Sequence, residues 1–154
     1  MRLVSLKLFF VLLLLTALTA AGCVRQSDQS NAVKLEDLPG TYRILRNNGE
    51  ANDQSFNVED KNGVWHLSDE EGSRLMRRMA ASEIEEIFGK EVAEKSQCLE
   101  IPGSTSTTVI CVTEPGVSTN VRIGDYNFHG DFTSDTGYFV YVSYMGASNL
   151  EKIK

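Results

Sequence analysis

The chain has 154 residues, a length that suits one domain and is too short for two of ordinary size. Hydrophobic residues make up 42% and charged residues 23%, which argues against a disordered chain. The net charge is −6, and it becomes −8 if Arg2 and Lys7 are removed with the N-terminal segment described next. Because an acidic chain without a basic block tracks a phosphate backbone poorly, we expect no nucleic-acid partner.

The N-terminal residues have the order of a secretory signal peptide. Arg2 and Lys7 flank the start of an uncharged run, LFFVLLLL at residues 8–15, and small residues follow up to Gly22. The apolar run is shorter than the roughly 20 residues that a membrane-spanning helix needs. The sequence therefore predicts that residues 1–22 are removed on export.

Residues 18–23, LTAAGC, resemble the lipobox of bacterial lipoproteins, in which small residues precede a cysteine. Ala20 departs from this pattern, since Leu is commoner there. The resemblance implies that Cys23 is acylated, that the chain is cut before it, and that membrane lipid anchors the protein stably. Position 24 is Val rather than the Asp that retains such proteins at the inner membrane of enteric-type bacteria, which implies an outer-membrane anchor and a periplasmic domain. The alternative is ordinary cleavage with Cys23 as a free thiol, a liability in an oxidising compartment.

Residues 23–37 are predicted to be the lipidated cysteine and a flexible tether, because they are polar, lack aromatic side chains and show no sustained period. Residues 38–154 then form one domain. Its first strand is expected at 41–46, with Tyr42 and Ile44 on one face.

A hairpin follows, in which strands at 56–59 and 64–67 flank a turn containing Asn62-Gly63, the strongest short hairpin signal. Trp65 and Leu67 share one face of the second strand. His66 is on the other face and is interpreted as a partly exposed strand residue rather than a ligand.

Residues 68–96 are expected to be helical. Two capping-box patterns occur, at Ser68 with Glu71 and at Ser82 with Glu85. The apolar residues form two sets that point in different directions on a helical wheel, so two pieces with a break near residues 81–82 are predicted. The sets are Leu75, Met76 and Met79, then Ile84, Ile87 and Phe88. Gly89 is the expected C-cap of the second piece.

Cys98 and Cys111 are predicted to form a disulfide, since setting Cys23 aside leaves an even number of cysteines in an exported chain. Strands at 97–101 and 107–113 with this pairing place Leu99 opposite Ile110 on the other face, and leave a four-residue loop at 103–106. Such a crosslink needs a non-hydrogen-bonded pair. A metal site or a catalytic thiol is disfavoured, because no His lies near either Cys in the sequence.

Seven of the eleven aromatic residues after position 22 lie in residues 121–145. From Tyr138 onward the strand is apolar on both faces, which predicts a central strand covered on both sides, with the helices as one cover. Residues 146–154 are expected to be a short polar tail with a closing edge segment at Leu150 and Ile153.

Asp125, His129 and Asp131 are the candidate metal ligands, because they share one face of a strand by period two. We favour the interpretation that they form the solvated polar face of a hairpin. The expected cofactor is none.

A second group of candidate functional residues is a basic cluster of Arg74, Arg77 and Arg78. We interpret it as surface charge paired with neighbouring carboxylates at 69–71, rather than as an anion-binding site. No nucleophile elbow, P-loop, dinucleotide fingerprint or zinc-protease helix occurs.

The predicted fold is α+β, a small curved antiparallel sheet of about six to eight strands with one helical segment, of two short helices, packed on it. The expected function is that of a non-catalytic, protein-binding envelope lipoprotein: an inhibitor, an immunity protein or an accessory subunit of an envelope machine. Two alternatives stay open. One is a small-ligand carrier with a cavity between the curved sheet and the helices, and the other is an envelope enzyme that uses the Asp125, His129 and Asp131 group.

Overall fold

The computed structural model describes residues 33–123 and 128–154, in which strands predominate over helices. The signal segment, Cys23, most of the tether and Asp125 lie outside these residues. The elements in chain order are η1 (Leu35–Asp37, a 3₁₀ helix), β1 (Gly40–Leu45), β2 (Ala51–Lys61), β3 (Val64–Asp69), β4 (Gly72–Arg78), α2 (Ala81–Phe88), α3 (Lys90–Lys95), β5 (Ser96–Glu100), β6 (Thr108–Thr113), β7 (Ser118–Ile123), β8 (Phe128–Thr133), β9 (Tyr138–Val142) and β10 (Gly146–Lys152).

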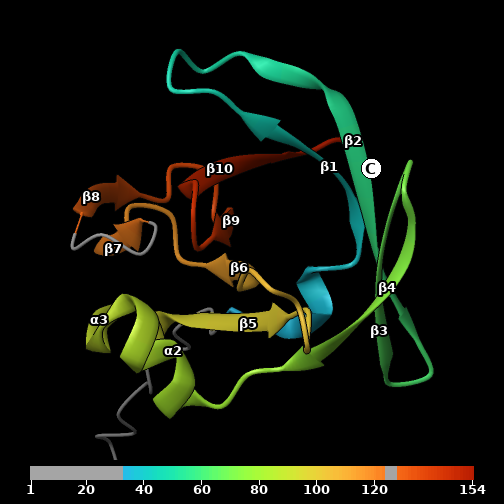
Figure 1. The fold of residues 1–154 in the computed structure, drawn as a ribbon, viewed down its shortest axis with the longest axis horizontal. Coiled ribbons are helices and arrows are strands. Elements are labelled where there is room, and N and C mark those ends of the chain that lie inside the picture. Colours follow the sequence, from blue (N-terminus) through green and yellow to red (C-terminus); the bar gives the residue numbers. More distant parts are fainter. Residues whose placement is uncertain (1–32, 124–127) are drawn as a thin grey trace, which may run out of the picture. The chain divides into compact units, whose positions relative to one another are not determined.

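Eight strands close into a barrel in the order β1-β10-β9-β6-β5-β4-β3-β2, and every pair is antiparallel (Figure 1). The two helices are inserted between β4 and β5, and the β7–β8 hairpin between β6 and β9. Apart from these insertions, each strand pairs with its chain neighbour. The predicted α+β fold, a small curved sheet with one helical segment packed on it, is therefore wrong: strands predominate and the sheet closes into a barrel, because β1 pairs with both β2 and β10.

The barrel interior is the first of two hydrophobic cores. One residue in two along each strand points inward, as the pleat requires. The buried members, which come from all eight strands and from the segment around η1, are Leu35, Leu38, Tyr42, Val58, Leu67, Met76, Leu99, Ile110, Val112, Val140 and Leu150. Leu150 is fully buried, so the predicted polar tail is an integral strand that closes the barrel.

Residues 72–78 form strand β4, so the first predicted helical piece is wrong. Asp69 pairs with Gly72 across a two-residue turn, and Trp65 pairs with Met76. Met76 is buried inside the barrel while the adjacent Leu75 is 56% exposed, which is the alternation of a strand. Pairing with β3 and β5 supplies the backbone hydrogen bonds that a helix would have made internally.

The second predicted helical piece is confirmed, although the two short helices meet at Gly89 rather than near residue 81. Gly89 adopts φ +87° and its N–H donates to the carbonyl of Glu85, so it caps α2 as expected. At the other end, Glu83 accepts a hydrogen bond from the backbone N–H of Ala80 at 2.7 Å, so the helix start lies two residues before the predicted capping box of Ser82 and Glu85.

The helices cover the outer face of the barrel and form the second core with the β7–β8 hairpin. The side chain of Phe88 lies against Phe139 and Tyr141 of β9, with ring centroids 5.5 and 5.3 Å apart. The other buried members of this second core are Met79, Ile84, Val92, Cys98, Val109, Cys111, Val117 and Val121. Since Val140 points into the barrel, β9 is apolar on both faces and covered on both, as predicted.

Two hairpins have the predicted pairing. Asn62 and Gly63, with φ +58° and +84°, make the two-residue turn between β2 and β3. Cys98 and Cys111 are paired on β5 and β6 and form the disulfide, with Cα atoms 4.2 Å apart. The backbone N–H of Ile101 donates to a carbonyl on β6, so the alternation along the ladder makes the cysteines a non-hydrogen-bonded pair.

The segment around η1 closes one end of the barrel. The hydroxyl of Tyr42 donates to the carbonyl of Leu38, and Lys152 Nζ donates to the carbonyl of Asp37 at 2.6 Å. Burial raises the pKa of Tyr42 and keeps its hydroxyl protonated as a donor. Leu35 is 3% exposed, so ordered structure begins before Leu38, the expected start of the domain.

Candidate functional site

A cavity with a volume of about 500 Å³ lies at the other end of the barrel. Its floor is apolar: Leu67, Ile110 and Val140, which are 5%, 0% and 7% exposed, belong to the barrel core. Its upper wall and rim mix apolar and polar groups, namely Ile44, Phe56, Asp69, Arg74, Ile101, Pro102, Gly103, Ser104, Ser106, Thr108, Val142 and Tyr144. The space therefore has an apolar base and an entrance of mixed polar and apolar groups.

Antiparallel pairing brings N-terminal ends of some strands and C-terminal ends of others together at this end of the barrel. The lining residues lie toward the C-terminal ends of β1, β3 and β9 and the N-terminal ends of β4 and β6. The contacts of η1 are with the opposite strand ends, through Tyr42, Tyr138 and Lys152. The barrel is thus plugged at one end by the segment that leads into β1 and open at the other.

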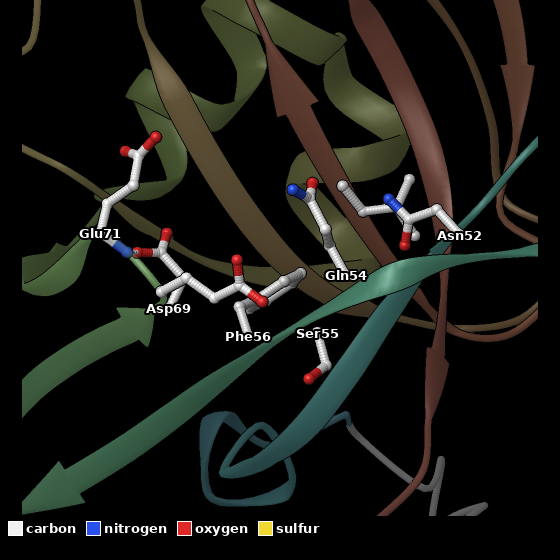
Figure 2. Close-up of a pocket in the computed structure, with 8 residues that line it drawn as sticks. Asn52, Gln54, Ser55, Phe56, Asp69 and Glu71 are labelled. Atoms are coloured by element: carbon white, nitrogen blue, oxygen red, sulfur yellow. Dashed lines mark hydrogen bonds between the residues drawn. The ribbon is translucent and has the colours of Figure 1, made fainter.

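A smaller pocket of about 220 Å³ adjoins the cavity and shares Ile44, Phe56 and Asp69 with it. Figure 2 shows Asp69 and Glu71, at the β3–β4 turn, on one side of this pocket and Gln54 and Asn52 of β2 on the other. The remaining lining residues are Ser55 and Glu70. Because three residues line both spaces, one molecule could extend from the core into the smaller pocket.

The charges at this entrance are unequal. Asp69 forms an ion pair with Arg74 and accepts a hydrogen bond from the backbone N–H of Glu71 at 3.0 Å. Within the described part of the chain, the carboxylates of Glu70 and Glu71 have neither an ion-pair partner nor a hydrogen-bond donor. The entrance therefore carries two uncompensated negative charges beside an apolar cavity.

The candidate metal ligands lie elsewhere. His129 and Asp131 are exposed on one face of β8, outside the barrel, and Asp125 is not among the described residues. His129 is paired with Arg122 in the register, and Asp131 accepts a hydrogen bond from Asn120 at 2.7 Å. Within residues 33–123 and 128–154, no three His, Cys, Asp or Glu side chains are grouped so that they could hold a metal ion.

The three arginines are on a strand rather than on a helix, and each has a partner. Arg74 pairs with Asp69, as expected. Arg77 bridges Glu83 of α2 and Glu100 of β5, and Arg78 donates to Gln97 at 2.6 Å. They serve to attach β4 to its neighbours.

The carrier alternative placed a cavity between the sheet and the helices, but side chains of the second core fill that space. The cavity inside the barrel was missed, although part of its signal was present. Tyr42 and Ile44 were correctly placed on one face, and that face is the barrel interior. Phe56 and Ile101 point to the same interior, but this arrangement depends on closure of the sheet, which alternation along one strand does not reveal.

None of the helices in the part of the chain described here has the length and apolar character required to cross a membrane. Comparison of the chain with protein-family models, with curated proteins and with solved structures found no match.

Proposed function

We propose that this protein is a lipid-anchored envelope lipoprotein whose barrel holds a small, largely apolar molecule at its open end. The observation that supports the proposal is the cavity of about 500 Å³ with an apolar floor. Ligand pockets in proteins measure about 300–1,000 Å³ and combine apolar walls with a few polar groups. Eight-stranded barrels are just wide enough for core side chains or one small ligand, and here η1 fills one end while the other is open.

The lining favours holding a ligand over transforming it. No histidine or cysteine is among the described residues that line the cavity, so no imidazole of the lining can act as a base for its hydroxyl groups, which belong to Ser104, Ser106, Thr108 and Tyr144. The two charged residues that line the cavity, Asp69 and Arg74, form an ion pair with each other. This inventory suits a carrier or a sensor of a small molecule.

Binding is tested with a neutral naphthylamine dye whose fluorescence rises in apolar surroundings. Val142 lines the cavity and is half-buried, so Val142→Phe fills part of the space. We expect this variant to lower dye affinity at least tenfold, because the added ring volume competes with the ligand. Val64→Phe is the matched control, since Val64 is 48% exposed outside the cavity, and it should bind like the wild type. Equal affinity of both variants, or no fluorescence rise with the wild type, would contradict the proposal.

The anchor is tested separately. The lipobox resemblance at residues 18–23 supports acylation of Cys23, so Cys23→Ala should abolish palmitate labelling and release the protein from the membrane fraction. The wild-type protein should sediment with outer-membrane markers, since position 24 is Val and not the Asp that retains such lipoproteins at the inner membrane. Persistent membrane association of Cys23→Ala without label would mean that another feature anchors the chain.

Protein binding is a second candidate function, supported by Tyr144 and Met145. These adjacent side chains at the turn between β9 and β10 are 62% and 68% exposed, and Tyr144 also borders the cavity. Aromatic residues and Met are enriched at protein interfaces. A photo-crosslinking residue at position 145 should capture a discrete envelope protein in intact cells, and that product should disappear with Tyr144→Ser. The absence of any crosslinked product would argue against this role.

A further inference from the structure

The charge at the open end of the barrel restricts which head group a bound molecule could carry. Arg74 is the one basic side chain among the described residues that line the cavity and its adjoining pocket, and Asp69 already neutralises it. Glu70 and Glu71 line the smaller pocket, and the structure gives their carboxylates no ion-pair or hydrogen-bond partner among residues 33–123 and 128–154. An anionic head group placed there would be repelled by both carboxylates, whereas a cation would be attracted.

The two spaces together are suited to an elongated molecule with two chemically different ends. The larger one reaches the core residues Leu67, Ile110 and Val140, and it accepts an apolar body. The smaller one, of about 220 Å³, is large enough for an ammonium group and its nearest methylenes. Phe56 lines both spaces, and an aromatic ring next to a head group adds attraction for a cation.

Resting on the ligand-binding function proposed above, we infer that the occupant is a cationic amphiphile: an apolar chain or ring that carries an ammonium group. The apolar body lies over the barrel core, and the ammonium group lies beside Glu70 and Glu71. The net charge of −6 over the whole chain acts in the same direction, because it disfavours fatty acids and other anionic amphiphiles at long range.

The test uses the full chain with Cys23→Ala, so that no acyl group of its own competes for the cavity. Decylamine, decanol and decanoate, each below its micelle concentration, are titrated into the protein by calorimetry. They share one alkyl chain and differ in charge. We expect the amine to bind three- to tenfold more tightly than the alcohol and the carboxylate to bind most weakly, the size of preference that two exposed carboxylates supply. The preference should shrink in high salt.

Replacing Glu70 and Glu71 together with Gln should remove the preference for the amine and leave the affinity for decanol unchanged. The matched control is Glu85→Gln with Glu86→Gln, which removes the same charge from the exposed face of α2. The control should retain the preference.

The outcomes separate the two proposals. If decylamine and decanol bind equally, or if the variant at positions 70 and 71 retains the amine preference, the head-group inference is wrong while the cavity remains a ligand site. Tighter binding of decanoate also overturns the inference. If none of the three amphiphiles binds, the ligand-holding function itself fails.

Discussion

Removal of the Cys98–Cys111 disulfide should destabilise the barrel by a predictable amount. The crosslink joins residues 13 apart in sequence, and closing a loop of this size contributes about 3 kcal/mol through the unfolded state. In the native state the two cysteines are 1% and 0% exposed and pack in the outer core against α2, α3 and β9. Replacing both with Ala also leaves a small cavity, so we expect Cys98→Ala with Cys111→Ala to lower the free energy of unfolding by about 3–5 kcal/mol.

Urea unfolding followed by the fluorescence of Trp65 measures this change, since Trp65 is the one tryptophan in the sequence and packs against the barrel core. The reduced wild type separates the two contributions: it keeps both sulfurs, so it should lose only the loop-closure part, about 3 kcal/mol. Thiol-reactive reagents should modify neither cysteine until the protein is both unfolded and reduced.

Equal urea midpoints for the oxidised and reduced wild-type protein would refute this reasoning. Such a result would mean that the unfolded chain is already restricted near this hairpin, or that the crosslink strains the barrel as much as it restrains the unfolded state. Two free thiols in protein recovered from an oxidising compartment would refute it more directly.

Three further predictions concern single residues. Tyr42→Phe removes the hydroxyl that holds Leu38 at the closed end, and it should lower the free energy of unfolding by about 1 kcal/mol in chemical denaturation. The hydrogen bond from Arg77 lowers the pKa of Glu83 to about 2, below its usual 4.5. The ionised Glu83 therefore stabilises the fold above pH 4.5, and this stabilisation is lost as the pH falls toward 2. Glu83→Gln should flatten that part of the acid-unfolding curve, and an unchanged curve would contradict the pairing with Arg77. Gly137→Ala should lower the melting temperature by several degrees, because Gly137 has φ +80° and a new Cβ would lie 3.1 Å from a backbone carbonyl oxygen; an unchanged temperature would mean that the turn relaxes freely.

Local chemistry explains the elements that were predicted correctly. Asn62-Gly63 adopts positive φ at low cost, so it specifies a turn wherever it is placed. The β5–β6 register follows from two requirements that agree, a cysteine pair on one face and Leu99 opposite Ile110 on the other. Gly89 ends α2 because it adopts the positive φ of a helix C-cap.

The segment of strand β4 was predicted as a helix because the apolar residues at 75, 76 and 79 have helical spacing. Leu75, Met76 and Met79 cluster on a helical wheel, yet in the barrel Met76 faces the interior, Met79 faces the outer core and Leu75 is exposed. Ser68 and Glu71 match a capping box by composition, whereas Glu71 belongs to the turn before Gly72. The decisive interactions are with β3 and β5, and local propensity is too weak to oppose them.

Four features could be predicted from the sequence alone, because each depends on residues that are close in the chain: the β2–β3 hairpin, the β5–β6 register with its disulfide, the two-faced strand β9 and the helix that ends at Gly89. The pairing of β1 with β10, more than 100 residues later in the chain, depends on the complete fold, as the ion pair between Arg43 and Glu151 illustrates. Closure turns alternating apolar residues on eight strands into one interior, with η1 at one end and a cavity at the other. The candidate site follows from this long-range pairing, because its lining residues come from strands that no local pattern brings together.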